Sequence, residues 1–197
     1  MNLDVLSYLL IFFILFISYR IYKRSDFFQL KCIFSDIDGE KYCVRERSKL
    51  KLAANRLAMV NENMKSVVNY CIEKHPDKEI TKRLEKGFNP KSITETLPTS
   101  EYTAYSENKG EKIAFCLDTK KNNQGKLIDL NTLTFVALHE LAHIGSKSIG
   151  HTPEFWRNFK FLLEQATAID IYEPVNYKKN PQIYCGMEIN DNPLFDL

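Results

Sequence analysis

Three of the four histidines in this 197-residue sequence lie within 13 residues, at positions 139, 143 and 151. His139 and His143 are four residues apart, so on a helix their imidazoles share one face and can reach one point. Glu140 follows the first histidine directly and projects beside that point. This His-Glu-x-x-His arrangement is typical of zinc hydrolases.

The expected chemistry depends on one catalytic Zn²⁺. Catalytic zinc sites use three protein ligands and keep a fourth position for water. We expect His151 to be the third ligand, because Gly145 and Gly150 let the chain reverse after the helix. Bound Zn²⁺ lowers the pKa of its water to about 7, and Glu140 is expected to accept the water's proton as the catalytic base. The predicted reaction is hydrolysis of a peptide bond in a protein or peptide substrate.

A carboxylate offers an alternative third ligand. Glu164 lies 21 residues after His143 on a following helix, where another class of His-Glu-x-x-His enzymes places such a ligand. We prefer His151, because Phe155 and Trp156 follow it on the face that would anchor its turn in the core.

Two other groups of residues invite a chemical interpretation. Tyr184, Cys185 and Met187 near the C-terminus predict either a methionine-containing turn beneath the zinc or ordinary packing, and packing is preferred. His75 precedes a proline and is interpreted as a solvated helix end.

The motif requires a helix, and the apolar run from Leu133 to His143 predicts one. Asn131 or Thr132 is the expected N-cap, and Gly145 is expected to end the helix. A second helix should begin at Thr152, before a proline at a favourable first position.

The remaining pattern predicts an α+β fold. Turn residues between β-prone runs predict two hairpins, and apolar residues at intervals of three and four predict a long helix. These elements are the hairpins over 31–44 and 102–117, the long helix over 48–71 and a short helix over 81–86.

The N-terminus predicts a membrane anchor. Leu3 to Tyr22 is almost free of charge and gives about 30 Å of helix, enough to cross a bilayer. The basic residues Arg20, Lys23 and Arg24 follow the apolar stretch, whereas a cleaved signal peptide begins with basic residues. Because positive flanks stay in the cytosol, we expect the rest of the chain to face the cytosol. A buried core helix is the alternative.

The five cysteines are an odd number at irregular spacing: Cys32, Cys43, Cys71, Cys116 and Cys185. No Cys-x-x-Cys pair is present, so we expect reduced thiols, in agreement with a cytosolic location.

The segment Val136-Ala-Leu-His-Glu-Leu-Ala-His143, followed after seven residues by His151-Thr-Pro-Glu-Phe-Trp156, resembles the WLM metalloprotease family, relatives of the SprT and Spartan proteases. The strand ending in Ile113-Ala-Phe-Cys-Leu117 also resembles that family's edge strand. Members rich in lysine and asparagine occur in large DNA viruses. The resemblance implies a zincin-like fold, zinc held by His139, His143 and His151, and Glu140 as catalytic base.

The resemblance covers roughly residues 48–172. Together with the sequence pattern it divides the chain into an anchor (1–24), a hairpin and linker (25–47), a zincin-like domain (48–173) and a C-terminal extension packed on or near the domain (174–197). Family members are linked to proteolysis of proteins crosslinked to DNA. A formal net charge of +2 gives no electrostatic case for nucleic-acid binding. The preferred hypothesis is therefore a single-pass, membrane-anchored zinc endopeptidase, in a host or virion membrane. The alternatives are a non-catalytic zinc-binding scaffold and a DNA–protein crosslink repair protease.

Overall fold

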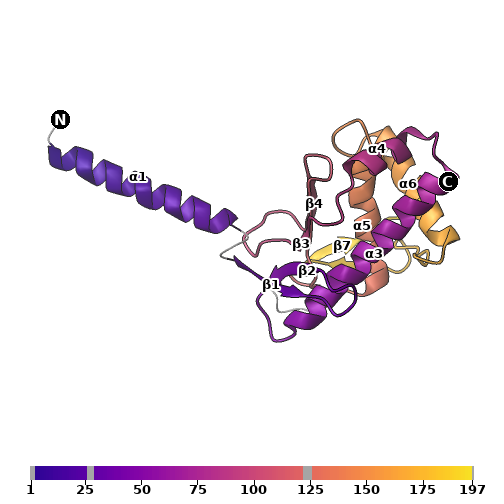
Figure 1. The fold of residues 1–197 in the computed structure, drawn as a ribbon, viewed down its shortest axis with the longest axis horizontal. Coiled ribbons are helices and arrows are strands. Elements are labelled where there is room, and N and C mark those ends of the chain that lie inside the picture. Colours follow the sequence, from indigo (N-terminus) through magenta and orange to yellow (C-terminus); the bar gives the residue numbers. More distant parts are fainter. Residues whose placement is uncertain (1–2, 26–28, 122–125, 197) are drawn as a thin grey trace.

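A computed structural model describes residues 3–25, 29–121 and 126–196 and shows one long helix projecting from a body of helices and short strands (Figure 1). The predicted α+β class is confirmed. The helices are α1 (Leu3–Arg24), α3 (Leu50–Lys74), α4 (Glu79–Gly87), α5 (Leu130–Gly145) and α6 (Pro153–Ala168). The strands are β1 (Leu30–Phe34), β2 (Lys41–Arg45), β3 (Ile93–Glu95), β4 (Ala104–Glu107), β5 (Lys112–Phe115), β6 (Gln182–Tyr184) and β7 (Met187–Ile189).

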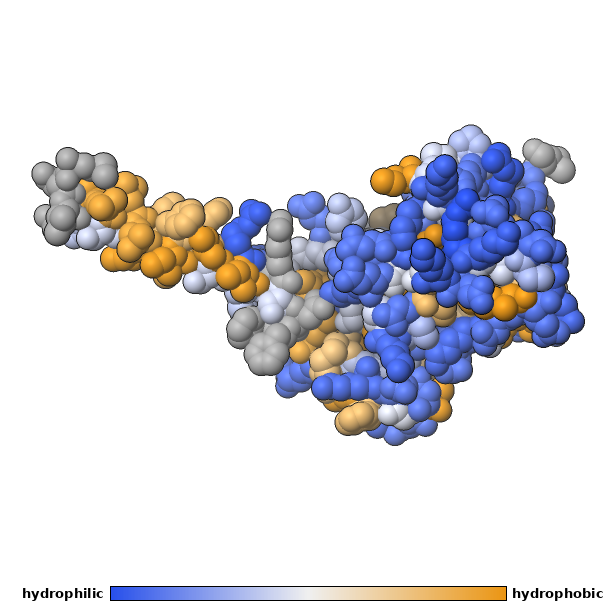
Figure 2. All heavy atoms as spheres, turned by 45° about the horizontal axis from the view of Figure 1, so that its top comes forward, coloured by the Kyte–Doolittle hydropathy of each residue, from blue (hydrophilic) through white to orange (hydrophobic). Residues whose placement is uncertain are grey.

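Helix α1 stands apart from the core. Its stretch Val5–Lys23 has a mean hydropathy of 2.0, is long enough to cross a membrane, and buries none of its residues in the protein. Figure 2 shows this helix as an apolar rod beside a mainly polar body. The alternative of a buried core helix is therefore wrong.

Helix α5 lies at the centre of the body. It packs against α3, α4, α6 and β4, and most of its residues are buried. The close packing against α4 explains why α5 ends in a glycine, because a Cβ on Gly145 would lie 2.6 Å from Cγ1 of Ile80. The helix that carries the motif is thus packed against three other helices and one strand, which fixes the directions of its side chains.

Side-chain caps define where α5 and α6 begin. The Asp129 side chain accepts a hydrogen bond from the backbone N of Thr132 at 2.8 Å, so the expectation of Asn131 or Thr132 as N-cap is wrong by two or three residues. Thr152 caps α6 as expected and is followed by Pro153. The end of α5 at Gly145 and the cap of α6 at Thr152 leave a short connection between the two helices, which contains His151.

The largest sheet has three strands in the order β3-β5-β4. Strands β4 and β5 form the predicted hairpin, and β3 pairs in parallel with β5. Strand β3 is not among the elements that the sequence analysis predicts. The hairpin β1–β2 forms a separate two-stranded sheet, also as predicted.

Buried charges join β2, β3 and the end of β5. Arg45 is fully buried and donates hydrogen bonds to backbone carbonyls of Thr96, Leu97 and Lys121. Glu95 accepts from the backbone N of Arg45 at 2.7 Å and pairs with Arg47, which also reaches Asp118. Desolvation raises the pKa of Glu95, and the neighbouring arginines oppose that rise. Each buried charge has a partner of opposite sign.

Four of the five cysteines are paired, so the expectation of reduced thiols is wrong for these four. Cys32 and Cys43 face each other across β1 and β2, and Cys116 at the end of β5 is joined to Cys185 in the β6–β7 turn. Cys71 is free and buried in α3. Irregular sequence spacing concealed both pairs, because each depends on strand pairing or on a contact between distant segments.

Candidate metal centre

The three clustered histidines converge in space. The Nε2 atom of His139 lies 3.2 Å from Nε2 of His143 and 3.0 Å from Nε2 of His151. One nitrogen from each of the three rings lies within 4.8 Å of the others. Helix α5 supplies the first two rings, and the connection between α5 and α6 returns the third.

The separations of 3.2 and 3.0 Å between His139 and the other two rings fit a metal ion. With tetrahedral geometry and Zn–N distances near 2.0–2.1 Å, ligand nitrogens lie about 3.3 Å apart. A neutral imidazole carries one proton on its two nitrogens, so three Nε2 atoms facing one another cannot all be satisfied by hydrogen bonds among themselves. A cation at their meeting point would satisfy all three.

The ring of Phe155 contacts all three histidines. The Phe155 ring centroid is 4.8 Å from that of His139, 4.4 Å from His143 and 4.7 Å from His151. Phe155 is fully buried in the first turn of α6, as the sequence analysis expected. Trp156 contacts His151 at 5.7 Å between centroids but is 40% exposed, so only Phe155 anchors the turn in the core.

Burial lowers the pKa values of two histidines and raises the pKa of Glu140, so that it favours the neutral form of each side chain. Desolvation, with repulsion from the neighbouring rings, lowers the pKa of His139 to about 3. Desolvation and His151 lower the pKa of His143 to about 4. Burial raises the pKa of the Glu140 carboxyl to about 8. The helical imidazoles are therefore neutral at pH 7, the state in which they bind metals, and a nearby cation would favour ionised Glu140.

The histidines and Glu140 line a cleft of about 910 Å³. Its walls come from β4, from the connection after α5 and from the C-terminal hairpin β6–β7. The lining is mainly apolar, and several apolar residues at the cleft are well exposed: Ile149 is 89% exposed, Tyr102 65% and Met187 53%. A cleft of this size can hold several residues of an extended peptide.

Of the other residues singled out in the sequence, Tyr184 and Met187 line the same cleft, whereas Glu164 and His75 lie outside its lining. Glu164 is on the exposed face of α6 and is not among the ligand atoms that gather at the cluster. His75 caps the end of α3 and is half-buried, bonded to Gln165 at 2.8 Å, rather than solvated as expected. Of the two that line the cleft, Tyr184 is buried, whereas Met187 is exposed.

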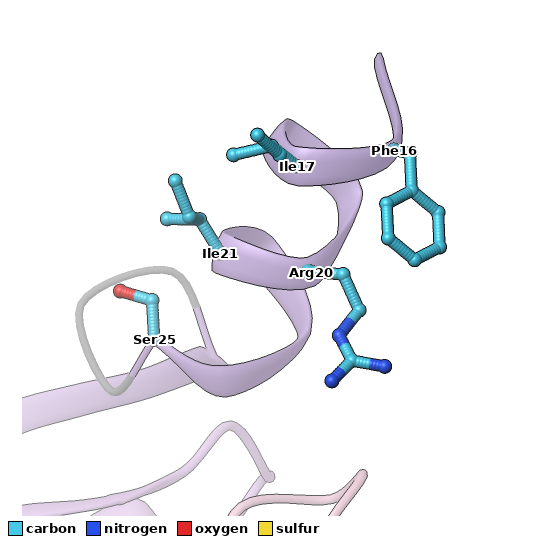
Figure 3. A pocket seen from close by; sticks show the side chains of 5 residues that line it. All are labelled: Phe16, Ile17, Arg20, Ile21 and Ser25. Atoms are coloured by element: carbon cyan, nitrogen blue, oxygen red, sulfur yellow. The ribbon is translucent and has the colours of Figure 1, made fainter. Parts of the chain in front are cut away.

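A second pocket, shown in Figure 3, lies beside the C-terminal end of α1. Phe16, Ile17, Arg20, Ile21 and Ser25 line it. Arg20 is the one ionisable side chain in this lining, so the pocket offers no set of groups for catalysis.

Comparison with known proteins relates the chain to proteins of large DNA viruses. Uncharacterized protein R325 of Acanthamoeba polyphaga mimivirus is 30% identical over 164 residues, which cover 81% of this chain and 82% of that protein. Uncharacterized protein 136R of Invertebrate iridescent virus 6 is 37% identical over 76 residues, 38% of this chain and 41% of that protein. No protein-family model and no solved structure matches. The chain belongs to the same family as protein R325.

Proposed function

We propose that this protein is a zinc-dependent peptidase with a zincin-like fold, anchored in a membrane by α1. The observation that carries the proposal is the convergence of three imidazole nitrogens beside Glu140 in an apolar cleft. The resemblance of the motif to WLM metalloproteases points to the same activity.

The histidines would hold the ion, and Glu140 would handle protons. Zinc bound by His139, His143 and His151 supplies Lewis-acid chemistry, which makes a bound water acidic at neutral pH. Glu140 follows His139 on α5 and would serve as the base that takes a proton from water and later gives it to the leaving amine. The apolar walls exclude bulk water and position an extended peptide chain.

The membrane assignment rests on α1. An apolar helix of 22 residues that buries none of its Val5–Lys23 stretch in the protein requires another apolar environment. The basic residues at its C-terminal end favour the cytosolic side for the body. The disulfides Cys32–Cys43 and Cys116–Cys185 remove the argument from free thiols and favour the opposite side, so this orientation depends on the basic flank alone.

Glu140→Gln tests the activity. The variant should bind zinc as the parent does yet lose hydrolysis by about 10²–10⁴-fold, because an amide neither accepts nor returns the water's proton. The measurement is zinc content together with cleavage of a denatured protein by the full chain in detergent.

Glu164→Gln is the matched control, since it makes the same chemical change on the exposed face of α6. Equal activity of Glu140→Gln and the parent would contradict the role of Glu140. Zinc binding without cleavage of any substrate by the parent would favour the non-catalytic scaffold.

A further inference from the structure

The third histidine differs from the other two in how it is supported. His139 and His143 are fixed by α5, whereas His151 is exposed and lies in the connection between Gly145, the last residue of α5, and Pro153, the first residue of α6. This connection has no regular secondary structure. The position of the His151 ring therefore depends on the side chains that bond to residues 146–150.

Glu154 holds the connection from the side of α6. Its carboxylate accepts hydrogen bonds from the backbone N of Lys147 at 3.0 Å, from the backbone N of Ser148 at 3.0 Å and from Oγ of Ser148 at 2.8 Å. Arg83 from α4 pairs with the same carboxylate at 3.1 Å and donates to the carbonyl of Gly145 at 3.2 Å. The backbone donors in particular lower the pKa of Glu154 to about 2, so it is ionised at neutral pH.

Lys109 also holds the connection. Its ammonium donates to three backbone carbonyls, those of His143 at 2.9 Å, Ser146 at 2.7 Å and Ser148 at 3.0 Å. These bonds match the three donors of an ammonium group. One of the three carbonyls belongs to a predicted metal ligand, and the other two precede His151.

The turn that carries Lys109 is itself fixed. Lys109 lies between β4 and β5 with a φ of +58°, and the adjacent Gly110 has a φ of +110°. A Cβ on Gly110 would collide with the carbonyl oxygen of Gly87 at the end of α4. This close approach docks the turn on α4 and brings the ammonium within reach of the end of α5.

We propose that Glu154 and Lys109 are positioning residues for the third metal ligand, which hold the connection between α5 and α6 so that His151 remains at the cluster. The inference rests on the metal site of the proposed function and adds to it the groups that complete the site. Polar groups that orient metal ligands typically contribute 10–100-fold to metal affinity.

A double-mutant cycle with His151→Ala tests this role, using zinc affinity of the full chain in detergent, measured by competition with a chelating dye. Glu154→Ala and Lys109→Met should each weaken zinc binding by about 10–100-fold in the parent. In the His151→Ala background, which retains two histidines and weaker binding, neither change should weaken zinc binding further. The absorption spectrum of the Co²⁺-loaded protein should shift in the same way for Glu154→Ala, Lys109→Met and His151→Ala, because each removes the same ligand.

Glu164→Ala is the matched control on α6 and should leave zinc affinity unchanged. Equal weakening of zinc binding in both backgrounds would show a general effect on the domain and overturn the inference, as would unchanged affinity in the parent. A parent that binds no zinc would overturn the metal site and the inference together. Tight, coupled zinc binding without peptide hydrolysis would overturn the proposed function alone and support the inference.

Discussion

At the scale of residues, the three imidazoles should contribute unequally to metal binding, because a helix carries two and a connection carries one. His139→Ala or His143→Ala should abolish stoichiometric zinc binding, since each leaves one helical ligand. His151→Ala should weaken zinc binding, whereas Glu164→Ala should leave it unchanged. Metal analysis of the purified full-length variants measures the difference.

Two results would contradict this assignment. Full zinc content in both helical variants would show that His139 and His143 do not bind the ion. A larger loss of zinc in Glu164→Ala than in His151→Ala would show that Glu164 on α6 is the third ligand.

The buried carboxyl of Glu140 should make the metal-free protein sensitive to alkaline pH. Its pKa is raised from 4.5 to about 8 in the folded state, so the folded protein binds the proton more tightly than the unfolded chain. Its stabilising contribution is complete below pH 4.5 and is lost as the pH rises toward 8, by about 1 kcal/mol per pH unit. Metal-free Glu140→Gln should lose less stability than the parent over this interval, as measured by urea unfolding.

Zinc provides the internal control for that measurement. A cation beside Glu140 favours its ionised form, so zinc-loaded protein should show a smaller difference between parent and variant. An equal pH dependence of the unfolding free energy for metal-free parent and variant would contradict the prediction.

The sequence predicts the centre of the site because the three histidines and Glu140 are close together in the sequence. Spacing of four residues puts His139 and His143 on one face of a helix, and glycines indicate the return toward His151. Lys109 and Glu154 carry no such signal. Lys109 contributes through contacts with residues 34 to 39 positions away, and turn residues of this kind usually indicate only a hairpin.

At the scale of elements, the Cys116–Cys185 bond should stabilise the C-terminal wall of the cleft. The bond closes a loop of 69 residues, for which chain entropy gives about 4 kcal/mol. Replacing both cysteines with alanine should lower the free energy of unfolding by about that amount. It should also reduce activity, because Met187 and its neighbours line the cleft.

The Cys32–Cys43 pair is the matched control, since its separation is only 11 residues and it lies away from the cleft. Its removal should cost about 3 kcal/mol by the same relation and leave activity intact. Equal losses of activity from both double substitutions would show that the C-terminal wall has no special role.

The predicted elements were those with strong periodicity or turn signals. Helix α3 buries the predicted face, from Ala53 to Cys71, and the two hairpins form at their predicted turns. Strand β3 and the hairpin β6–β7 were missed because each strand has three residues, too few to show an alternating pattern. Their pairing depends on partners distant in sequence.

At the scale of the whole molecule, α1 should hold the protein in membranes against high salt and carbonate but release it in detergent. Burial of an apolar helix in hydrocarbon is insensitive to salt, whereas attachment through Arg20 and Lys23 alone would be screened. Fractionation of membranes that contain the full chain measures this. Complete release by salt would show that α1 does not span the membrane.

Protease added to sealed vesicles measures the orientation. The basic flank predicts that the body faces the cytosol and is digested in vesicles with the cytosolic side outward. Disulfide bonds are rare in the cytosol and favour the opposite side. Protection of the body until detergent is added would show that the body faces away from the cytosol, contrary to the proposed orientation.

The short connection between α1 and the body limits how far the cleft can lie from a membrane that contains α1. Five residues separate Arg24 from Leu30, and five residues span at most about 18 Å. The end of α1 also contacts the body, since Oγ1 of Thr99 donates to the carbonyl of Lys23 at 2.6 Å. With α1 in a bilayer, the body stays in a thin layer at the surface, where proteins of the same membrane meet it at a high effective concentration and distant soluble proteins do not. For the proposed peptidase, location would then select the substrate, and the broad apolar cleft would need little sequence specificity of its own.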